Sequence, residues 1–539
     1  MSLPTSPRAR MHGGINPPGN KQQSLRHPIR RLPLPPQLIV PVQQRGEPLP
    51  ELLIGIGDRV EKGQCLARGR GERAVSSHAP AAGVVTDIGA QPLPDDQAGG
   101  VTCVTIATEP CVASARCLPP LDPVECGNEM FLQRLRDAGI TGLGGAGFPT
   151  HAKVRAAIGR VETLIVNATE CEPFITADAA LLQERAADVL RGASLLLQIT
   201  GATRCLVGIQ DDAPAAIASL QAAMTDARFQ LCVLPARYPH GAEALLVHVL
   251  TGREVPMGRP AIDYGVLCHN PATLHAVARA VLHGEPLISR VMTLTGAALR
   301  DPGNYDVLIG TPVAVALQAC GLDEWQHSRS LAGGPLLGVE LQQATVPLIK
   351  TSNCILATTE AELPRPPPSQ PCIRCGLCAD VCPVRLLPQQ LHWFWRSGEL
   401  DKAAAHHLED CIDCGACAYV CPSTIPLVQQ FRLAKTSLAE QRARQRQADR
   451  ARERFEAHQA RVATQQRLDE QRRRERAALL QRKQAEAAAR TETVNAVTAS
   501  SAPSPQDVIA AALARVQARK AAKRTAEPTA LPPEGEAPP

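Results

Sequence analysis

The chain of 539 residues contains no long hydrophobic run. Its longest uncharged stretch, Val307–Leu322, is interrupted by Gly310, Pro312 and Gln318. A helix that crosses a membrane needs about 20 consecutive, mostly apolar residues, and the sequence therefore excludes a membrane-spanning helix. The first residues, MSLPTSPRARMHGG, also lack the apolar core of a secretory signal, so we expect the chain to stay in the cytoplasm.

Aromatic residues are scarce as well, at 3% of the chain. The formal net charge of +5 hints at an acidic partner, but residues 1–431 hold 35 Lys and Arg against 39 Asp and Glu. Residues 432–539 hold 22 against 13, so the basic character belongs to the tail. A basic tail raises the alternative of a nucleic-acid-binding protein, yet it has only Phe455 to stack on bases. We favour a solvated helix of mixed charges, with attraction to anionic lipid or to a partner as a further alternative.

Changes of composition along the chain predict several domains. Short β-branched runs between Gly and Pro predict an all-β unit, and apolar strands (TLIVNA, CLVGIQ, FQLCVLP) that alternate with helices over 177–198 and 213–223 predict βαβ units. The segments VMTLTG, YDVLIGTPVAVAL and VPLIKTSNCILA return to β character, and LPRPPPSQP is a stiff linker. The predicted boundaries are 1–37 for an extended lead-in, 38–110 for the all-β unit, 125–287 for the α/β domain, 288–362 for a second β domain, 363–435 for a Cys-rich domain, and 436–539 for a charged helical tail with a disordered end.

The 19 cysteines need an explanation other than disulfides, because the cytoplasm keeps thiols reduced. Two runs, CIRCGLCADVCP and CIDCGACAYVCP, each follow the pattern C-x2-C-x2-C-x3-C-P. In two-cluster ferredoxins the first three cysteines of such a run bind one [4Fe-4S] cluster, and the fourth binds the other. The predicted ligands are Cys372, Cys375, Cys378 and Cys421 for the first cluster, and Cys382, Cys411, Cys414 and Cys417 for the second.

A pair of zinc knuckles is the alternative for these runs. Zinc takes four ligands in two pairs, and two runs of four cysteines exceed that pattern. The remaining cysteines, Cys65, Cys103, Cys205 and Cys354 among them, lack C-x2-C spacing. We expect them to be small buried packing residues.

A glycine-rich loop, GLGGAGFPT from Gly142, formally matches G-x-G-x-x-G. A dinucleotide-binding turn follows a strand and opens a helix, whereas this loop follows a helical segment at 130–140, which disfavours a standard NAD-binding turn. Its backbone amides can still approach a phosphate or a flat ring, with Lys153 placed downstream to meet a phosphate. A purely structural turn is the alternative.

Polar residues also gather where apolar strands end. In an α/β sheet such positions are where ligands bind. Each residue alone could be a cap or a turn, but together they predict one site. They are Asn167, Glu170, Glu172, Tyr238, Gly241, Glu243 and Asn270.

The motifs GLGGAGFPTHAK, NATECEP and YPHGAEALL, with the duplicated cysteine runs, resemble those of the C subunit of the Rnf-type electron transport complex over roughly residues 12–435. The middle domain is also similar to the NADH-binding flavoprotein subunit of respiratory complex I. The chain departs from these patterns at Thr169, where the complex I motif has an acidic flavin ligand, and at His240 and Ala242. The resemblance implies FMN binding by Gly142, Gly144, Gly145, Gly147, Lys153, Asn167 and Asn270. It places the catalytic candidates Glu170, Glu172, Tyr238 and Glu243 near flavin and nicotinamide.

The resemblance implies a multidomain α/β plus all-β fold. Its parts are a lipoyl-like barrel-sandwich unit (38–110), a Rossmann-like FMN/NADH-binding domain (125–287), a soluble-ligand-binding β-grasp domain (288–362), a two-cluster ferredoxin-type α domain (363–435) and the tail. In the barrel-sandwich unit, the hairpin AVSSHAP is expected to be exposed. It holds no Lys, so we expect a docking role and no lipoylation.

The function implied is that of a peripheral electron-input subunit on the cytoplasmic side of the cell inner membrane. It would belong to an ion-translocating oxidoreductase of the NADH:ferredoxin type. Electrons from the substrate NADH would pass through FMN and two [4Fe-4S] clusters to integral membrane subunits, an iron-sulfur subunit and a ferredoxin-type partner, with no nucleic acid involved. The alternative is a flavin-free iron-sulfur conduit or assembly subunit that does not oxidise NADH itself.

Overall fold

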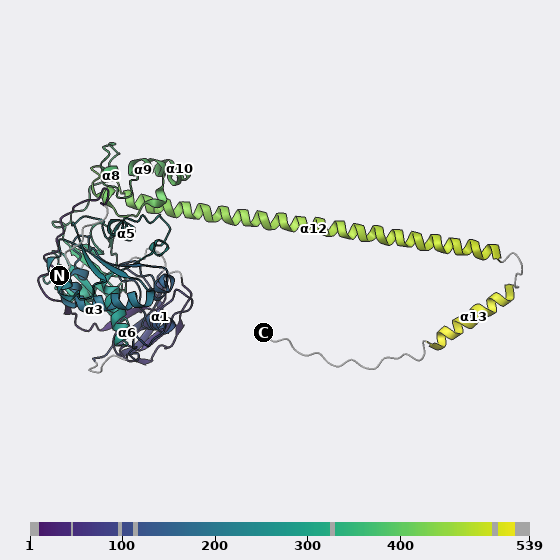
Figure 1. Cartoon of the computed structure of the whole chain (residues 1–539), viewed down its shortest axis with the longest axis horizontal. Coiled ribbons are helices and arrows are strands. Elements are labelled where there is room, and N and C mark those ends of the chain that lie inside the picture. The colour runs from purple at the N-terminus through teal and green to yellow at the C-terminus, as the bar shows by residue number, and fades with distance from the viewer. Residues whose placement is uncertain are drawn as a thin grey trace. The chain divides into compact units, whose positions relative to one another are not determined.

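A computed structural model describes residues 10–44, 47–94, 100–110, 117–323, 329–497 and 505–522. The chain divides into two units, residues 1–440 and residues 441–539 (Figure 1). The start of the predicted lead-in, residues 1–9, and the last part of the predicted disordered end, residues 523–539, lie outside the described residues. Among those described, no helix is both long enough and apolar enough to cross a membrane.

The N-terminal part of unit 1 consists of two small antiparallel sheets. Their orders are β2-β8-β7-β4 and β3-β5-β6. Alternate residues of β2 and β8, such as Leu38, Val40, Val104 and Ile106, meet in one buried cluster, as expected for strands with one face inward. The strands are β2 (Gln37–Pro41), β3 (Glu51–Leu52), β4 (Arg59–Val60), β5 (Cys65–Arg68), β6 (Ser77–His78), β7 (Gly83–Gln91) and β8 (Val101–Thr108).

The segment AVSSHAP does not form the exposed hairpin that was expected. All seven residues, 74–80, are buried. Arg136 donates to the Ala74 carbonyl, and its own backbone carbonyl accepts from the Ser76 amide. The small side chains of this segment allow it to pack beneath the next domain, and the expectation of an exposed hairpin was wrong.

The middle of unit 1 is a parallel sheet in the order β11-β10-β9-β12. Its strands are almost continuously apolar because both faces are covered: Leu164 and Val166 of β9 face one buried cluster and Ile165 faces another. The elements are α1 (Asn128–Asp137), α2 (Thr150–Ala157), β9 (Thr163–Ala168), α3 (Ala177–Thr200), β10 (Arg204–Gln210), α4 (Pro214–Ala223), β11 (Phe229–Leu234), α5 (Glu243–Thr251), η1 (Ala261–Tyr264), β12 (Val266–His269) and α6 (Pro271–Leu282). The strands and helices predicted here from the sequence are confirmed.

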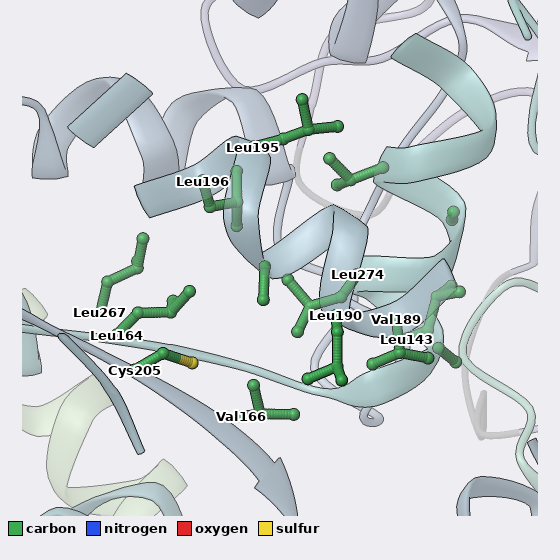
Figure 2. Packing of buried hydrophobic residues seen from close by; sticks show 14 of the residues in the cluster. Leu143, Leu164, Val166, Val189, Leu190, Leu195, Leu196, Cys205, Leu267 and Leu274 are labelled. Carbon is green, nitrogen blue, oxygen red and sulfur yellow. The ribbon is translucent and has the colours of Figure 1, made fainter. Parts of the chain in front are cut away.

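The larger of these two clusters joins the sheet to α3 and α6. Figure 2 shows Val189, Leu190, Leu195 and Leu196 of α3 and Leu274 of α6 beside Leu164, Val166, Cys205 and Leu267 of the strands. Leu143 of the glycine-rich loop lies in the same cluster. Each fully buried leucine contributes about 1.5–3 kcal/mol, so this core holds the loop against the sheet.

The next sheet is mixed, in the order β1-β14-β13-β17-β15-β16. Its strands are β1 (Arg30–Arg31), β13 (Ser289–Thr295), β14 (Gly303–Leu308), β15 (Arg329–Ala332), β16 (Val339–Glu340) and β17 (Cys354–Thr358). The predicted β character of VAVAL is wrong, because Val313–Ala319 forms the helix α7. Pro312 precedes the helix, and Val313, Ala316 and Leu317 share its buried face, a helical spacing that overrides β-branching.

The Cys-rich segment forms short helices that gather beside the start of the long helix α12 (Leu427–Val497) (Figure 1). They are α8 (Leu377–Asp380), α9 (Pro388–Ser397), α10 (Leu400–Ala405), η3 (Leu408–Asp410) and α11 (Ala416–Tyr419). The two cysteine runs have matching backbones: Gly376 and Gly415 occupy corresponding positions at φ 83° and 79°. Arg374 and Asp413 also correspond, with φ of 58° and 55°.

The tail is helical further than the sequence predicted. α12 spans Leu427–Val497, whereas the charged helical tail was predicted to begin at residue 436. Residues Pro505–Ala522 form α13, so the prediction of disorder is wrong for this stretch. Pro505 is pre-organised for the first helical position, and the Ala-rich sequence behind it has high helix propensity.

Candidate functional site

A cavity of about 250 Å³ lies at the carboxyl ends of β9 and β12. We call it the charged cavity, because Glu170, Glu172, Asp178 and Arg290 line it. In the strand order β11-β10-β9-β12, the chain continues from β9 to β10 and β11 on one side of β9. It then crosses to β12 on the other side of β9, so the direction of strand addition reverses between β9 and β12. Such a reversal leaves a crevice at the strand ends where ligands bind. Of the residues predicted from the sequence, the cavity brings together Gly144, Asn167, Glu170, Glu172, Tyr238, Gly241 and Asn270.

Asn167 holds two walls of the cavity together. Its side-chain amide donates to the Gly241 carbonyl at 2.8 Å, and its Oδ1 accepts from the Thr169 amide at 3.2 Å. Gly241 packs so closely that a Cβ atom there would lie 2.5 Å from the Thr169 carbonyl oxygen. Only glycine fits this approach, which explains why the turn after Tyr238 carries it.

Glu170 and Asn270 are tied to helix N-termini. The Glu170 carboxylate accepts from the Asp178 amide at 3.0 Å and from the Ala179 amide at 3.2 Å, in the first turn of α3. Asn270 caps α6 by accepting from the Ala272 amide at 2.9 Å, and its side-chain amide donates to Asp178. These bonds satisfy backbone amides that a helix leaves unpaired, so both side chains shape the cavity.

Glu172 has a free oxygen in the cavity wall. Its Oε1 accepts from the Leu336 amide at 2.8 Å and the Leu337 amide at 3.1 Å, whereas its buried Oε2 has no hydrogen-bond partner among the described residues. Burial raises the pKa of Glu172 to about 7, although the two amide bonds act in the opposite direction. This side chain can therefore hold or release a proton at neutral pH.

Asp178 and Arg290 complete the charged part of the cavity. Burial and the neighbouring Glu170 carboxylate raise the pKa of Asp178, and the Arg290 guanidinium opposes that rise. Arg290 is itself buried and donates to the carbonyls of Val291 and Lys350. The cavity thus combines three carboxyl groups with one arginine, and the like charges of Glu170 and Asp178 favour the protonated form of Asp178.

Tyr238 links the cavity to the Cys-rich segment. Its side chain is buried, and its hydroxyl donates to the Cys414 carbonyl. Cys414 and Ile412 themselves line the cavity. The lead-in packs against the same residues. The Ile15 amide donates to the Tyr238 carbonyl at 2.9 Å, and the Gly14 amide donates to the Val381 carbonyl at 2.8 Å.

Five predicted residues do not line this cavity. Gly145 and Gly147 face a separate cavity of about 450 Å³, and Gly142 lines neither of the two. Lys153 and Glu243 form an ion pair at 3.0 Å, and Lys153 also donates to the carbonyl of Cys268 on β12 at 2.8 Å. The glycine-rich loop therefore separates two cavities, with Leu143 and Gly144 on the side of the charged one.

The first set of cysteines lines one small cavity. Cys372, Cys375, Cys378 and Cys421 all contribute to it, although Cys421 comes from the other run. Cys375 is exposed, and the other three are partly exposed. This grouping brings the fourth cysteine of one run to the first three of the other.

The second set is more deeply placed. Burial raises the pKa of Cys417, and the neighbouring Cys411, Cys414 and Cys382 raise it further. Burial also raises the pKa of Cys411 to about 12 and that of Cys414 to about 11. This influence places Cys411, Cys414 and Cys382 near Cys417, and Cys378 of the first set also contributes, so the two sets adjoin each other.

The donor sets fit iron-sulfur clusters. Among the described residues, no three His, Cys, Asp or Glu side chains lie close enough together to bind a single metal ion. Zinc requires four such ligands about 2.0–2.3 Å from one centre, whereas a cluster places several iron and sulfide atoms between its thiolates. For a flavin, the observation that fits is the unpaired Glu172 Oε2, which lies in a cavity lined by both polar and apolar residues.

Sequence reasoning missed three residues of the charged cavity. Asp178 was missed because an acidic residue in the first turn of a predicted helix is common. Arg290 could have been found, because a charged residue at the start of an otherwise apolar strand is unusual. Cys171 was counted as a packing residue but lines the cavity. Among the other cysteines of that group, Cys103, Cys205 and Cys354 are buried as predicted, while Cys65 is half-buried and Cys117 is exposed.

Three protein families match the chain. The Nuo51 FMN-binding domain matches residues 135–279, the RnfC barrel sandwich hybrid domain residues 9–110, and the 4Fe-4S dicluster domain residues 371–425. The chain thus carries an FMN-binding domain and a 4Fe-4S dicluster domain. Together with the barrel-sandwich unit, they make a mixed α/β multidomain protein.

Several curated proteins are similar over most of the chain. The C subunit of the ion-translocating oxidoreductase complex of Pseudomonas aeruginosa (strain PAO1) is 47% identical over 462 residues, which are 86% of this chain and 59% of that protein. The protein of the same name from Yersinia pestis bv. Antiqua (strain Antiqua) is 46% identical over 452 residues, 84% of this chain and 73% of the relative. The chain spans about three-fifths of the length of the first relative.

One solved structure is more distantly similar. The crystal structure of an NAD+-reducing [NiFe]-hydrogenase in the H2-reduced state aligns with a TM-score of 0.41 and 21% identity, over 57% of this chain and 63% of that chain. This similarity is too low to assign the fold or the function of the hydrogenase to this chain.

Proposed function

The chain belongs to the family of the C subunits of ion-translocating oxidoreductase complexes, and we propose that it is the peripheral electron-input subunit of such a complex. Its substrate would be NADH, and electrons would pass through FMN and two [4Fe-4S] clusters to a ferredoxin-type partner. The other partners would be the integral membrane subunits and an iron-sulfur subunit, with the protein on the cytoplasmic side of the inner membrane. The observation that carries this proposal is the shared wall of the charged cavity and the second cysteine set, at Tyr238 and Cys414.

The proposed flavin site is the charged cavity with the glycine-rich loop. When bound, FMN supplies the conversion between a two-electron hydride donor and the single electrons that a cluster accepts. In this proposal Glu172 orients the polar edge of the ring through its free Oε2 and holds a proton near neutral pH. Asn167 and Gly241 set the width of the cavity, and Asn270 with Gly144 forms its floor. Lys153, which is paired with Glu243, would meet the phosphate once this ion pair opens, and Glu243 would stay near the flavin and nicotinamide.

The proposed order of the clusters follows from burial. Cys414 of the second set lines the charged cavity, whereas Cys375 of the first set is exposed. Electron transfer favours short steps between neighbouring centres. We therefore place the second cluster next to the flavin, and the first cluster at the exit to the partner.

The domain boundaries are part of the same proposal. Residues 125–287 would form a Rossmann-like domain, 288–362 a soluble-ligand-binding β-grasp domain, and 363–435 a ferredoxin-type domain. The parallel order β11-β10-β9-β12 supports the first assignment. The mixed sheet with α7 packed on it supports the second. Matching backbone angles in the two cysteine runs support the third.

A flavin-free electron conduit is the second candidate function. It is favoured by the fact that the polar groups of Asn167 and Asn270 are engaged within the protein. It predicts iron-sulfur clusters without flavin and no response to NADH.

The test that separates the two functions uses the full chain purified without oxygen. Acid extraction should release about one flavin per chain, and titration with NADH should bleach the flavin absorbance and produce the EPR signals of reduced clusters. Release of flavin with no spectral change on NADH would contradict NADH entry. Intact clusters without any flavin, even after incubation with FMN, would support the conduit.

A further inference from the structure

A further cavity, distinct from the one with the unpaired Glu172 and from the one at Gly145 and Gly147, has an excess of positively charged residues. It measures about 430 Å³ and lies between α3, α6 and the start of β13. Its walls come from three parts of unit 1: Lys62 from the N-terminal sheets, Arg185 and His275 from the α/β body, and Arg31 from the strand β1. Its volume is within the range of small-molecule sites. We call it the basic cavity.

The carboxylates of the basic cavity are already paired. Asp188 pairs with Arg191 at 3.4 Å, Glu285 pairs with Arg279, and Asp306 lies 3.9 Å from Arg31. Lys62 and Arg185 form no ion pair with any carboxylate of the described part of the chain. Two cations from different parts of unit 1 thus line one cavity, and neither is neutralised by an ion pair with a carboxylate of the described residues.

The backbone is unusual at the same place. α3 departs from helical geometry at Arg185, with φ −132° and ψ 30°. No proline or glycine lies within a turn of this position, but Ser219 of α4 donates to the Gln183 carbonyl at 2.9 Å. Side chains that bond to helix carbonyls bend helices, and backbone outliers concentrate at functional sites. Arg185, the residue at this bend, lines the basic cavity.

The remaining walls have two further properties. Aliphatic side chains such as Ile140, Leu143 and Leu181 lie behind the lining and are almost fully buried, so the polar residues supply most of the surface that a ligand can reach. His275 lies among the cations, where burial together with the charges of Arg185 and Arg279 lowers its pKa to about 4 against a weaker opposite effect of Asp188 and Asp306. At neutral pH it is an uncharged side chain that can donate or accept one hydrogen bond. A ligand that fits would have a polyanionic end and a group that forms a hydrogen bond with His275.

We propose that the basic cavity binds a small phosphorylated ligand of the nucleoside diphosphate class, with its phosphates between Arg185 and Lys62 and its base beside His275. Arginine and lysine are the usual partners of phosphate groups, and such bonds are about twice as strong as neutral ones. The site goes beyond the proposed electron-input function and requires neither flavin nor clusters. It adjoins the charged cavity only through Leu143 and Arg290, which line both.

The test is equilibrium dialysis of the full chain with ADP and with inorganic pyrophosphate as probes. Saturating FMN is present so that the flavin site is not available to the probes. We expect ADP to bind with a Kd tighter than about 1 mM, pyrophosphate to compete with it, and adenosine to compete at least tenfold less well. Arg185→Gln and Lys62→Gln should each weaken ADP about tenfold, while Arg185→Lys should recover most of the loss.

The matched control is Arg155→Gln, an exposed arginine of α2 that pairs with Glu129 and does not line the cavity. It should bind ADP like the unmodified chain. If Arg185→Gln does not fold, as judged by its melting curve, Lys62→Gln decides, because Lys62 lies on a different part of the chain. Absence of ADP and pyrophosphate binding at about 1 mM, or equal binding by the control, Arg185→Gln and Lys62→Gln, would overturn the proposal.

Discussion

The two cysteine runs have nearly the same sequence and the same backbone angles, but they lie in different surroundings. The first set reaches solvent at Cys375. The second is covered by Tyr238, by the lead-in at Ile15 and by the loop at Leu336, whose carbonyl faces Gly415. The comparison teaches that a repeat determines the local geometry of a ligand set, while its role depends on segments far away in the sequence.

The largest effect on cofactor content is expected from removing one cysteine from each of the two cysteine sets in turn. Cys414→Ala and Cys375→Ala should each lose one cluster, or about half of the iron, because a [4Fe-4S] cluster needs four thiolates. Iron analysis and EPR measure this. The two variants should then differ: NADH should still reduce the remaining cluster in Cys375→Ala but not in Cys414→Ala. Equal reduction in both would contradict the proposed order of the clusters.

The next effect concerns Glu172, which holds the loop over the second set. Its pKa is about 7 in the folded chain and about 4.5 in the unfolded one, so the folded state binds more protons between these values. Stability should therefore fall as pH rises from about 5 to 7, by at most about 3 kcal/mol. In Glu172→Gln, which keeps the Oε1 acceptor, this fall should be smaller. Thermal melts at pH 5 and pH 8 test it, and parallel pH profiles for the two proteins would refute it.

A smaller effect is expected from Tyr238→Phe, which removes one hydrogen bond to the Cys414 carbonyl. The cost should be about 1 kcal/mol, and the reduction potential of the second cluster should shift while that of the first stays constant. The matched control is Tyr419→Phe, which changes an exposed tyrosine beside the second run. A redox titration followed by EPR measures both potentials. An equal shift of the two clusters would show that Tyr238 does not distinguish them.

The smallest effect is expected from removal of residues 441–539. Both cysteine sets and the charged cavity lie in unit 1, and the helical residues after 440 that the structure describes are exposed. Iron content and melting temperature should stay the same. Membrane recruitment in cells, measured by fractionation, then shows whether the tail attaches the protein to anionic lipid or to a partner. Normal recruitment would remove that role from the tail.

Local patterns in the sequence predicted much of the fold. Continuous apolar runs such as TLIVNA identified the strands of the parallel sheet, because strands covered on both faces need no polar side. The rule that ligands bind at strand ends brought Asn167, Glu172 and Asn270 to one cavity. The strand predictions succeeded because each depended on residues close together in the chain, and the strand-end rule needed only the parallel order of those strands to bring the three residues together.

The rest depended on distant contacts. Nothing local in AVSSHAP shows that α1 packs over it, and nothing in the glycine-rich loop shows that Gly145 and Gly147 face a different cavity from Gly144. Val313–Ala319 was misassigned because β-branched residues fit both a strand and a buried helix face. Asp178 and Arg290 were missed because their roles arise only when α3 and β13 meet.

The contact of the lead-in with Tyr238 and Val381 has a consequence for folding. Residues 14 and 15 are synthesised long before Val381, which follows only after the α/β body and the mixed sheet. Contacts between such distant residues form late, because a long loop must close before they contribute. The α/β body can therefore be made with its cavity still open on one side. The last wall is added when the Cys-rich segment docks, so a chain could receive its cofactors before the final closure.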